Sequence, residues 1–178
     1  MKYIALLRGI NVSGQKMIKM AALAKLFESL KFSSVRTYIQ SGNVVFDSRA
    51  STEGAIVRRI ETALQGQYGF AVPVILRSEK DWTKIINANP FLVRKGINEA
   101  RLYVAFLRDK IERKSFPELD PYRRHNEEFV VTGREIYLHY PEGFGTTKLT
   151  NQIFEQKLGT VATTRNLNTL YALTELLG

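Results

Sequence analysis

The residues that could bind a ligand gather in loops that contain glycine. Leu6–Lys16 reads LLRGINVSGQK and lies between an apolar run and an amphipathic helix pattern, a position where binding residues concentrate. Gly9 and Gly14 have the glycine spacing of a Walker A phosphate loop. The match then fails, because Gln15 stands where lysine belongs and Met17 replaces the Ser or Thr that holds magnesium. The loop therefore argues against an NTPase and leaves a simple anion site open.

Two stretches in the second half also combine a cation with small polar residues. Glu142–Lys148 leads from a strand into a helix and places Lys148 in the first helical turn, where it opposes the helix dipole. A bound anion would explain that lysine, and plain exposure to solvent explains it more simply. Thr163–Asn166 sets Arg165 among small polar groups, which suits a bidentate clamp for carboxylate or phosphate. A second interpretation of this stretch is that Thr164 or Asn166 caps the last helix.

Composition excludes several kinds of catalytic site. The 178 residues include no cysteine, which rules out disulfides, thiol nucleophiles and thiolate metal sites. The two histidines, His125 and His139, lack the spacing of a metal-binding motif, and no metal or cofactor is expected. No serine lies in a nucleophile-elbow motif, and no acid–base pair emerges. Whether the protein is an enzyme therefore stays open.

The charge of the chain favours acidic partners. There are 26 Lys and Arg against 17 Asp and Glu, which gives a net charge of +9. Such a surplus favours phosphates and nucleic acid, although ordinary solubility charge explains it at least as well. The N-terminal apolar run, Tyr3–Leu7, is too short for a signal sequence or a membrane span. We therefore expect a cytoplasmic protein without a membrane partner, in an oligomeric state that the sequence does not specify.

The first half of the chain reads as a β-α-β-β-α-β unit followed by a helix. Alternating β-formers predict strands, and apolar residues three and four apart predict helices. Ser41-Gly42 is the turn of a hairpin. Ser51 or Thr52 caps the second helix, and Ser78 opens a capping box. The predicted elements are strand Tyr3–Arg8, helix Ile18–Leu30, strands Val35–Gln40 and Asn43–Asp47, helix Thr52–Gln65, strand Val72–Arg77 and a helix from Ser78 to Ile86.

The second half repeats this order. Tyr103–Arg108 matches Tyr3–Arg8, which is the cue to a tandem duplication. Pro117 is expected to stop a short helix, and Gly159 to follow the end of another. The predicted elements are strand Leu102–Arg108, helix Lys110–Phe116, loop Asp120–Asn126, strands Glu128–Thr132 and Glu135–Tyr140, helix Thr146–Leu158, strand Val161–Thr163 and helix Leu167–Leu177.

The predicted fold is α+β, with two tandem ferredoxin-like subdomains. Chain breakers within Asn87–Asn98 place the N-terminal subdomain at residues 1–90 and the C-terminal subdomain at residues 91–178. In such a unit, the loop after the first strand and the turn after the second lie at the same end of the sheet. Gly9–Lys16 and Gln40–Asn43 should therefore meet, at the N-terminus of the helix that begins near Ile18, where free N–H groups favour an anion.

This topology gathers a polar rim in the first half. For Arg8, Asn11 and Asn43, a ligand-binding role and a purely structural role are both open, because Asn also satisfies backbone groups in turns. For Ser13 and Gln15 the structural interpretation is favoured. The candidate ligand-binding residues of the whole chain are Arg8, Asn11, Lys16, Gln40, Ser41, Asn43, Lys148, Arg165 and Asn166.

The segments LLRGINVSG, VRTYIQSGNVVF, NPF, YVAFL and TTRNLNT, together with Lys148, resemble a bacterial family of unknown function. The resemblance covers nearly the whole chain. It implies tandem ferredoxin-like subdomains and no particular activity. In that family Arg-Asn is usually followed by Trp, whereas this chain has Leu167. If that Trp stacks on a ligand, this chain lacks the stacking group; if it is a core residue, Leu fills its place.

Three functions stay open at this point. The positive charge and the glycine-containing loops favour a non-catalytic protein that binds a phosphate-bearing ligand, either a nucleotide or RNA. The first alternative is an enzyme that acts on a small anionic metabolite in a cleft between the two halves, with Arg8, Lys148 and Arg165 as substrate clamps. The second alternative is a protein–protein interaction module. The fold cannot choose among them, because ferredoxin-like units host many functions.

Overall fold

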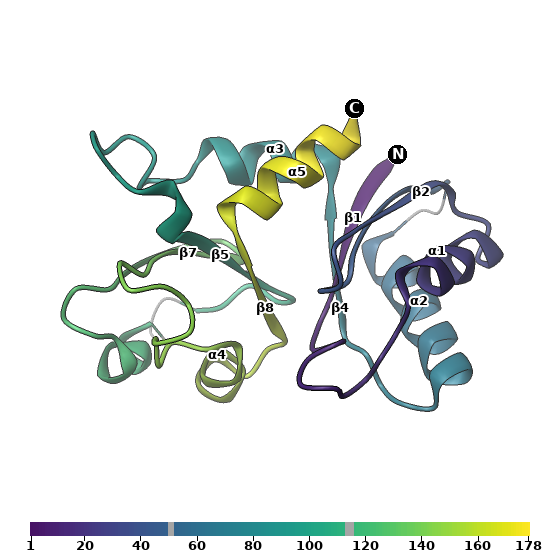
Figure 1. Cartoon of the computed structure of the whole chain (residues 1–178), viewed down its shortest axis with the longest axis horizontal. Helices are drawn as coiled ribbons and strands as arrows, with labels where there is room; N and C mark the ends of the chain where they lie inside the picture. Colours follow the sequence, from purple (N-terminus) through teal and green to yellow (C-terminus); the bar gives the residue numbers. More distant parts are fainter. Residues whose placement is uncertain (50–51, 113–115) are drawn as a thin grey trace. The chain divides into compact units, whose positions relative to one another are not determined.

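The computed structural model describes residues 1–49, 52–112 and 116–178. In these ranges the chain forms two four-stranded antiparallel sheets with helices (Figure 1), which confirms the predicted α+β class with tandem ferredoxin-like halves. The chain divides into two compact units. Unit 1 comprises Met1–Lys84 and Ala172–Gly178, and unit 2 comprises Ile85–Tyr171.

Unit 1 has the strand order β2-β3-β1-β4, with every neighbouring pair antiparallel. Two helices cover one face of this sheet (Figure 1). The elements are β1 (Lys2–Leu7), α1 (Met20–Ser29), β2 (Ser33–Tyr38), β3 (Asn43–Asp47), α2 (Glu53–Tyr68), β4 (Val74–Ser78) and α3 (Glu79–Asn87), which crosses the division between the units.

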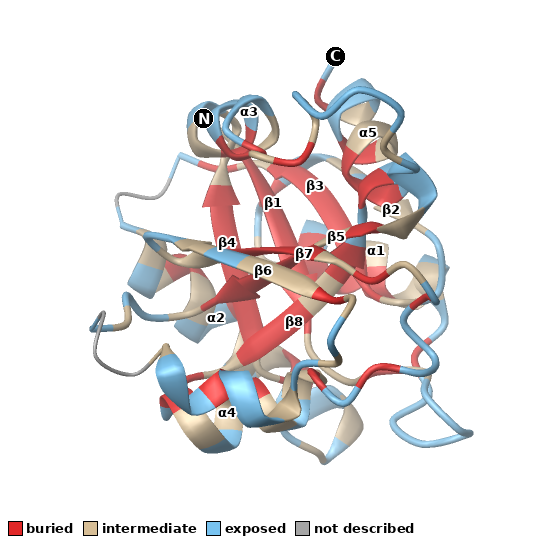
Figure 2. Cartoon of the chain, turned by 90° about the vertical axis from the view of Figure 1, so that its left-hand side faces the viewer, coloured by how far each residue is buried: buried red, intermediate tan, exposed pale blue. Residues whose placement is uncertain are grey.

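The core of unit 1 lies between the sheet and the helices α1 and α2. Strands β1, β3 and β4 are almost entirely buried (Figure 2). Phe27 of α1 packs its ring edge-on to Phe46 of β3, with 5.2 Å between centroids, and Phe32 lies 4.6 Å from the same ring. Burial of such large apolar side chains stabilises the fold by roughly 1.5–3 kcal/mol each. The sheet and its helices therefore form a rigid support for the loops at its ends.

Unit 2 repeats the strand order as β6-β7-β5-β8. The ladder registers match as well, since Tyr3 pairs with Ser78 as Tyr103 pairs with Asn166. The elements are the 3-10 helix η1 (Glu99–Arg101), β5 (Leu102–Leu107), the 3-10 helix η3 (Pro117–Tyr122), β6 (Glu128–Thr132), β7 (Glu135–His139), α4 (Asn151–Leu158), β8 (Ala162–Asn166) and α5 (Leu167–Leu177), which also crosses the division.

One predicted helix of unit 2 is wrong over its described residues. Residues 110–112 and Phe116 are not helical, and residues 113–115 lie outside the described chain. Pro117 begins the 3-10 helix η3 rather than stopping a helix, because proline lacks an N–H and fits a first helical position. The segment is charged and has no apolar stripe to hold a helix against the sheet.

Two other boundaries in unit 2 also differ from the prediction. Helix α4 begins at Asn151 rather than Thr146, because the Thr150 hydroxyl accepts from the Ile153 N–H and caps the helix there. Lys148 therefore precedes the helix instead of lying in its first turn. Strand β8 runs to Asn166, so Arg165 belongs to a strand and not to a loop.

The predicted caps are confirmed where the structure describes them. Thr52 accepts from the Ala55 N–H at the start of α2. Ser78 accepts from the Asp81 N–H (3.2 Å). Gly159 ends α4 in the left-handed conformation, with φ of 66°.

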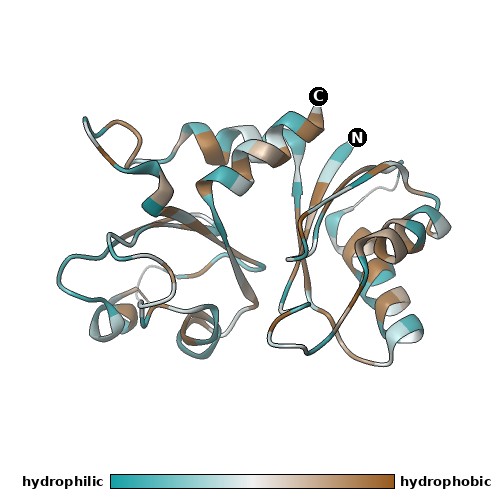
Figure 3. Cartoon of the chain, in the orientation of Figure 1, coloured by the Kyte–Doolittle hydropathy of each residue, from teal (hydrophilic) through white to brown (hydrophobic). Residues whose placement is uncertain are grey.

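The division between the units differs from the predicted boundary after residue 90. It falls at Lys84 instead, and the last seven residues group with unit 1. Hydrogen bonds explain this grouping, because Trp82 Nε1 donates to Thr174 Oγ1 (3.2 Å) and Arg36 donates to the Leu176 carbonyl (3.0 Å). Each helix described here mixes hydrophilic with hydrophobic residues (Figure 3), and none is long and apolar enough to cross a membrane.

Candidate functional site

The loop after β1 and the turn after β2 meet at one end of the unit 1 sheet. The Leu7 N–H donates to the Gly42 carbonyl (2.8 Å), and Asn11 Nδ2 donates to the Gln40 carbonyl (2.8 Å). The predicted meeting of these two segments is therefore confirmed. We call them together the loop rim, comprising Arg8–Lys16 and Ile39–Gly42.

Asn11 organises the longer of the two segments. Its Oδ1 accepts from the Ile18 N–H (2.7 Å), and its Nδ2 donates to the Ile18 carbonyl (2.9 Å) as well as to Gln40. Its backbone N–H donates to the Lys16 carbonyl (3.2 Å). The side chain thus closes the loop onto the approach to α1 and fastens it to the neighbouring turn. These hydrogen bonds support the structural interpretation of Asn11.

Asn43 does the same inside the hairpin. It is fully buried, and its Nδ2 donates to the Tyr38 carbonyl and to Ser41 Oγ, both at 3.0 Å. The Asn43 amide group therefore donates hydrogen bonds to two oxygens of the turn, and it is not exposed to solvent. Gln40 is exposed and Ser41 is half-buried, so these two remain accessible at the rim.

The rim contains an unusual concentration of left-handed backbone. Ile39 has φ of 47°, a conformation that a β-branched side chain adopts only under strain, and its side chain is 50% exposed. Such strain persists where the surrounding structure imposes it, and it clusters at binding and catalytic sites. The left-handed residues of the rim are Gly9, Asn11, Ser13, Gly14, Lys16, Ile39 and Gly42.

Two cations of the rim have different surroundings. Lys16 is exposed, and its Nζ donates to the Ala71 carbonyl (2.8 Å) before β4. Arg8 is half-buried, and its backbone N–H donates to the Pro73 carbonyl (2.9 Å). Both cations therefore stand at the end of the sheet where β1 finishes and β4 begins.

The stretch that forms the rim is strongly basic, a feature that sequence reasoning missed. Residues 1–46 contain seven Lys or Arg and one acid, Glu28, so they carry +6 of the net +9. A running count of charge along the chain is the signal that would have found it. Two of these seven cations, Arg8 and Lys16, lie in the rim itself, and the two rim segments contain no Asp or Glu that would compete with a phosphate.

The predicted residues of unit 2 have local structural roles. Asn166 Oδ1 accepts from the Thr169 N–H (2.8 Å) and caps α5, as its alternative interpretation predicted. Arg165 is 8% exposed and donates through Nη1 to Thr163 Oγ1 (2.7 Å) and to the Thr164 carbonyl (3.0 Å). Lys148 is exposed in the segment before α4. Of the three proposed clamps, Arg8 belongs to unit 1, and Lys148 and Arg165 belong to unit 2.

Arg165 has a twin that sequence reasoning did not notice. Arg77 occupies the same place in β4 and is 1% exposed. Arg77 Nη1 donates to the carbonyl of the preceding residue, Leu76 (2.8 Å), just as Arg165 does to Thr164. A buried arginine repeated by duplication is a scaffold feature, which weakens the case for Arg165 as a special anion clamp.

An ion-pair cluster in unit 2 was also missed, since its members are far apart in sequence. The Arg94 guanidinium donates two hydrogen bonds to the Glu128 carboxylate, at 2.7 and 2.8 Å. His139 Nδ1 lies 3.2 Å from the same carboxylate. The Arg94 guanidinium lowers the pKa of Glu128 to about 2. No group of His, Asp or Glu among the residues described could hold a metal ion.

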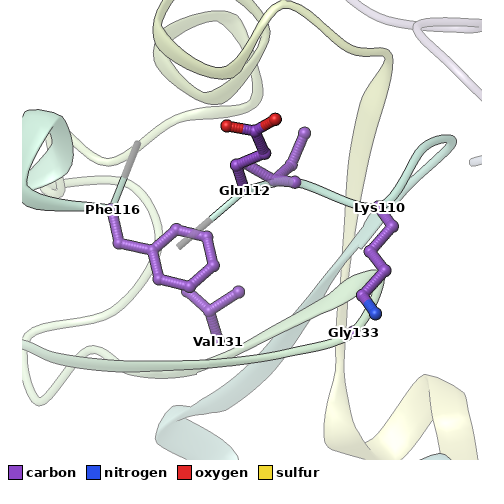
Figure 4. Close-up of a pocket in the computed structure, with 6 residues that line it drawn as sticks. Lys110, Glu112, Phe116, Val131 and Gly133 are labelled. Carbon is purple, nitrogen blue, oxygen red and sulfur yellow. The ribbon is translucent and has the colours of Figure 1, made fainter. Parts of the chain in front are cut away.

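Unit 2 also has a cavity of about 530 Å³ beside the edge strand β6 (Figure 4). The ring of Phe116 lies next to Val131 at its floor, and Lys110 reaches toward Gly133. Ile111 and Glu112 complete the described lining. Residues 113–115 lie between two of these lining segments and outside the described chain, so the cavity carries no functional conclusion.

Comparison with known proteins supports the fold and the family. A solved structure of a conserved bacterial protein from Streptococcus pneumoniae matches with a TM-score of 0.78 and 23% identity, over 99% of this chain and 98% of that one. At this identity the likeness shows the fold alone. Among proteins of curated function, none matches this sequence. The family described as "Protein of unknown function (DUF1697)" matches residues 1–137, which confirms the family resemblance seen in the motifs. The chain therefore belongs to the DUF1697 family.

Proposed function

We propose that this protein binds a phosphate-bearing ligand, a nucleotide or RNA, at the loop rim of unit 1. The observation that carries the proposal is the pairing of a strained, left-handed loop with two cations in the most basic part of the chain. Asn11 holds that loop in place before any ligand arrives, and preorganised sites bind with a smaller entropic loss.

The rim offers the donors that phosphate needs. Lys16 Nζ has three N–H donors and uses one on the Ala71 carbonyl, which leaves the others for a ligand. Arg8 supplies a planar guanidinium that can bind two phosphate oxygens at once. Ser13 and Gly14 are adjacent left-handed residues, and tight turns of this kind can aim backbone N–H groups at an anion.

The apolar side chains of the rim favour a nucleotide or RNA over bare phosphate. Val12, Met17 and Ile39 are 59%, 61% and 50% exposed, and all three lie in or directly beside the rim. Such side chains provide contact area for ribose and base faces next to the cations. We place this activity in the cytoplasm and invoke no membrane partner.

A salt series with a fluorescent single-stranded RNA tests the proposal. The double variant Arg8→Gln, Lys16→Gln should bind at least about tenfold more weakly, and the slope of log K against log salt should become shallower by about 0.7 for each phosphate that the protein no longer neutralises. The matched control is Lys80→Gln, an exposed residue of α3 at the opposite end of β4, which should keep its affinity. Absence of RNA and nucleotide binding at low salt, or equal losses in both variants, would contradict the proposal.

A further inference from the structure

The opposite end of the unit 1 sheet carries a second basic depression. Its lining residues lie where β1 and β2 begin and β3 ends, at the end of the sheet opposite the loop rim. Its volume is about 710 Å³, within the usual range for small-molecule sites. We call it the basic hollow, and its lining residues are Met1, Lys31, Phe32, Ser33, Asp47, Ser48, Arg49 and Arg59.

The side chains of the hollow carry a surplus of positive charge. The lining contains three cationic side chains, Lys31, Arg49 and Arg59, and one acidic side chain, Asp47. The side-chain charges therefore sum to +2. Ser33, which is exposed, adds a hydroxyl group that can donate to an oxyanion. This combination suits a small dianion better than an apolar molecule.

Arg59 is fixed in position before any ligand binds. Its guanidinium lies 5.0 Å from the centre of the Phe32 ring, and its Nη2 donates to the Leu30 carbonyl at the end of α1. An arginine stacked on a ring keeps its planar donor fork in one orientation. The hollow therefore has one cation held in a defined orientation, beside the two others on Lys31 and Arg49.

Lys31 occupies a position that normally belongs to glycine. Helix α1 ends in a Schellman pattern, in which the Lys31 N–H donates to the Glu28 carbonyl (2.9 Å) and the Phe32 N–H to the Phe27 carbonyl (3.4 Å). Lys31 has φ of 62° in this pattern, whereas α2 and α4 end on left-handed glycines, Gly69 and Gly159. A lysine in a conformation that favours glycine is strained, and a role for its charge would account for its presence there.

Part of that role is explained by the helix itself, because a cation stabilises a helix C-terminus. Glycine relieves the left-handed strain at this position under either explanation, so stability does not separate the two. Only a ligand role predicts that Lys31→Gly weakens binding.

We propose that the basic hollow is a second ligand site of unit 1, which binds a small phosphomonoester through Lys31, Arg49 and Arg59. This site is separate from the loop rim, because the two lie at opposite ends of the same strands. It does not depend on RNA binding at the rim.

Phosphorus NMR and thermal unfolding of the full chain, with ribose 5-phosphate and inorganic phosphate as probes, test this site. Ribose 5-phosphate should bind and raise the melting temperature in a concentration-dependent way. Lys31→Gly and Arg49→Gln should each weaken binding by about tenfold, the effect of removing one hydrogen bond to a charged group. Lys31→Gly should also melt at the same temperature as the wild type or higher. The matched control Lys25→Gln, exposed on α1, should bind normally.

Three results would overturn the proposal. The first is no binding of either probe, and the second is binding that both substitutions leave unchanged. The third is unchanged affinity of Lys31→Gly at any melting temperature, which would assign Lys31 to the helix alone. The rim variant Arg8→Gln, Lys16→Gln should bind ribose 5-phosphate at the hollow as the wild type does, so failure of one site is distinguishable from failure of the other.

Discussion

The ends of β1 and β5 are built alike up to the last residue of the strand. The N–H of Leu7 donates to the Gly42 carbonyl, and that of Leu107 donates to the Arg134 carbonyl, both at 2.8 Å. The next residue, arginine in both units, also donates its N–H in both units, to the Pro73 carbonyl (2.9 Å) or the Val161 carbonyl (3.0 Å). Duplication has therefore preserved the scaffold on which the following loops stand.

Beyond that point the two loops differ in sequence and in their hydrogen bonds. Unit 1 continues with Gly9 and the strained rim, whereas unit 2 continues with Asp109. The Asp109 carboxylate accepts a hydrogen bond from the Thr160 hydroxyl (2.8 Å). The backbone N–H of Asp109 donates to Thr160 Oγ1 (3.1 Å). The Asp109 carboxylate stands just after the strand, at the place that Gly9 has in unit 1, and an acid there disfavours a phosphate. The same supports thus position a glycine-containing loop held by Asn11 in one copy and a loop held by Asp109 in the other.

The largest expected change in the free energy of unfolding is at two turn glycines, Gly42 in unit 1 and Gly133 in unit 2. A Cβ on Gly42 would lie 2.7 Å from Ile10 Cδ1 and 2.8 Å from Leu7 Cβ, at φ of 79°. Gly42→Ala should therefore lower the free energy of unfolding by about 3 kcal/mol or more, from strain and overpacking together. Gly133→Ala, whose Cβ meets nothing closer than 3.7 Å, should lower it by about 1 kcal/mol. Urea denaturation measures both, and equal losses would show that the rim is not closely packed against this turn.

Asn11→Gly tests the loop closure itself. Glycine accepts the left-handed φ of 54°, so the substitution removes only the three side-chain hydrogen bonds. Stability should fall by about 2–3 kcal/mol, and the Ile18 amide should exchange its hydrogen faster. Ser13→Gly is the matched control, because Ser13 is also left-handed but exposed, and it should be neutral or stabilising. If Asn11→Gly kept full stability, the rim would not be preorganised by its asparagine.

The sequence was enough to predict the fold and the meeting of the two rim segments. Strand periodicity and the repeat of Tyr3–Arg8 at Tyr103–Arg108 determine the topology, and the topology brings Gly9–Lys16 to Gln40–Asn43. What a single sequence could not supply is the partner of each side chain. Asn11 and Asn43 were candidate ligand residues, and only coordinates show their amides used on backbone carbonyls.

The helix predicted at 110–116, which is wrong over its described residues, has a different cause. Its charged residues have adequate helix propensity, but no apolar stripe ties them to the sheet, and tertiary packing decides such segments. Lys148 was misplaced because Thr146, Thr147 and Thr150 are all good caps, and the sequence alone does not choose among them. The basic hollow could not be predicted from the sequence, because its lining residues come from segments that lie up to 58 positions apart, from Met1 to Arg59.

The substitution Ile39→Gly tests whether the backbone strain in the rim contributes to ligand binding. Half of the Ile39 side chain is exposed, so little burial is lost, and relief of its left-handed φ should raise the free energy of unfolding by about 1 kcal/mol. Val130→Gly in β6, the strand equivalent to β2, is the control and should lower it by about 1 kcal/mol. Weaker RNA binding by a stabilised Ile39→Gly variant would mean that the strain is kept for binding. A destabilised variant would mean that Ile39 is held by packing instead.

The smallest effect concerns the opposite end of the two sheets. Ser33 pairs with Asp47 beside the basic hollow, and in unit 2 the equivalent pair is Glu128 and His139. In unit 2, Arg94 binds the Glu128 carboxylate, in the way that a cation of the basic hollow would bind a phosphate in unit 1. The Glu128 pKa is lowered from 4.5 to about 2, so its contribution to stability is present above about pH 4.5 and is lost as the pH falls toward 2.

Glu128→Gln should therefore destabilise the protein by only about 0.5–1 kcal/mol at pH 7, because the side chain is 40% exposed and solvent screens the pair. The difference from the wild type should shrink steadily between pH 4.5 and pH 2, as the native carboxylate itself becomes protonated. Denaturant unfolding across this range measures it, and Glu118→Gln, exposed on η3, is the control that should show no such trend. A difference that persisted unchanged to pH 2 would mean that Glu128 stabilises unit 2 through packing, and that the ion pair is not what distinguishes this end of the two sheets.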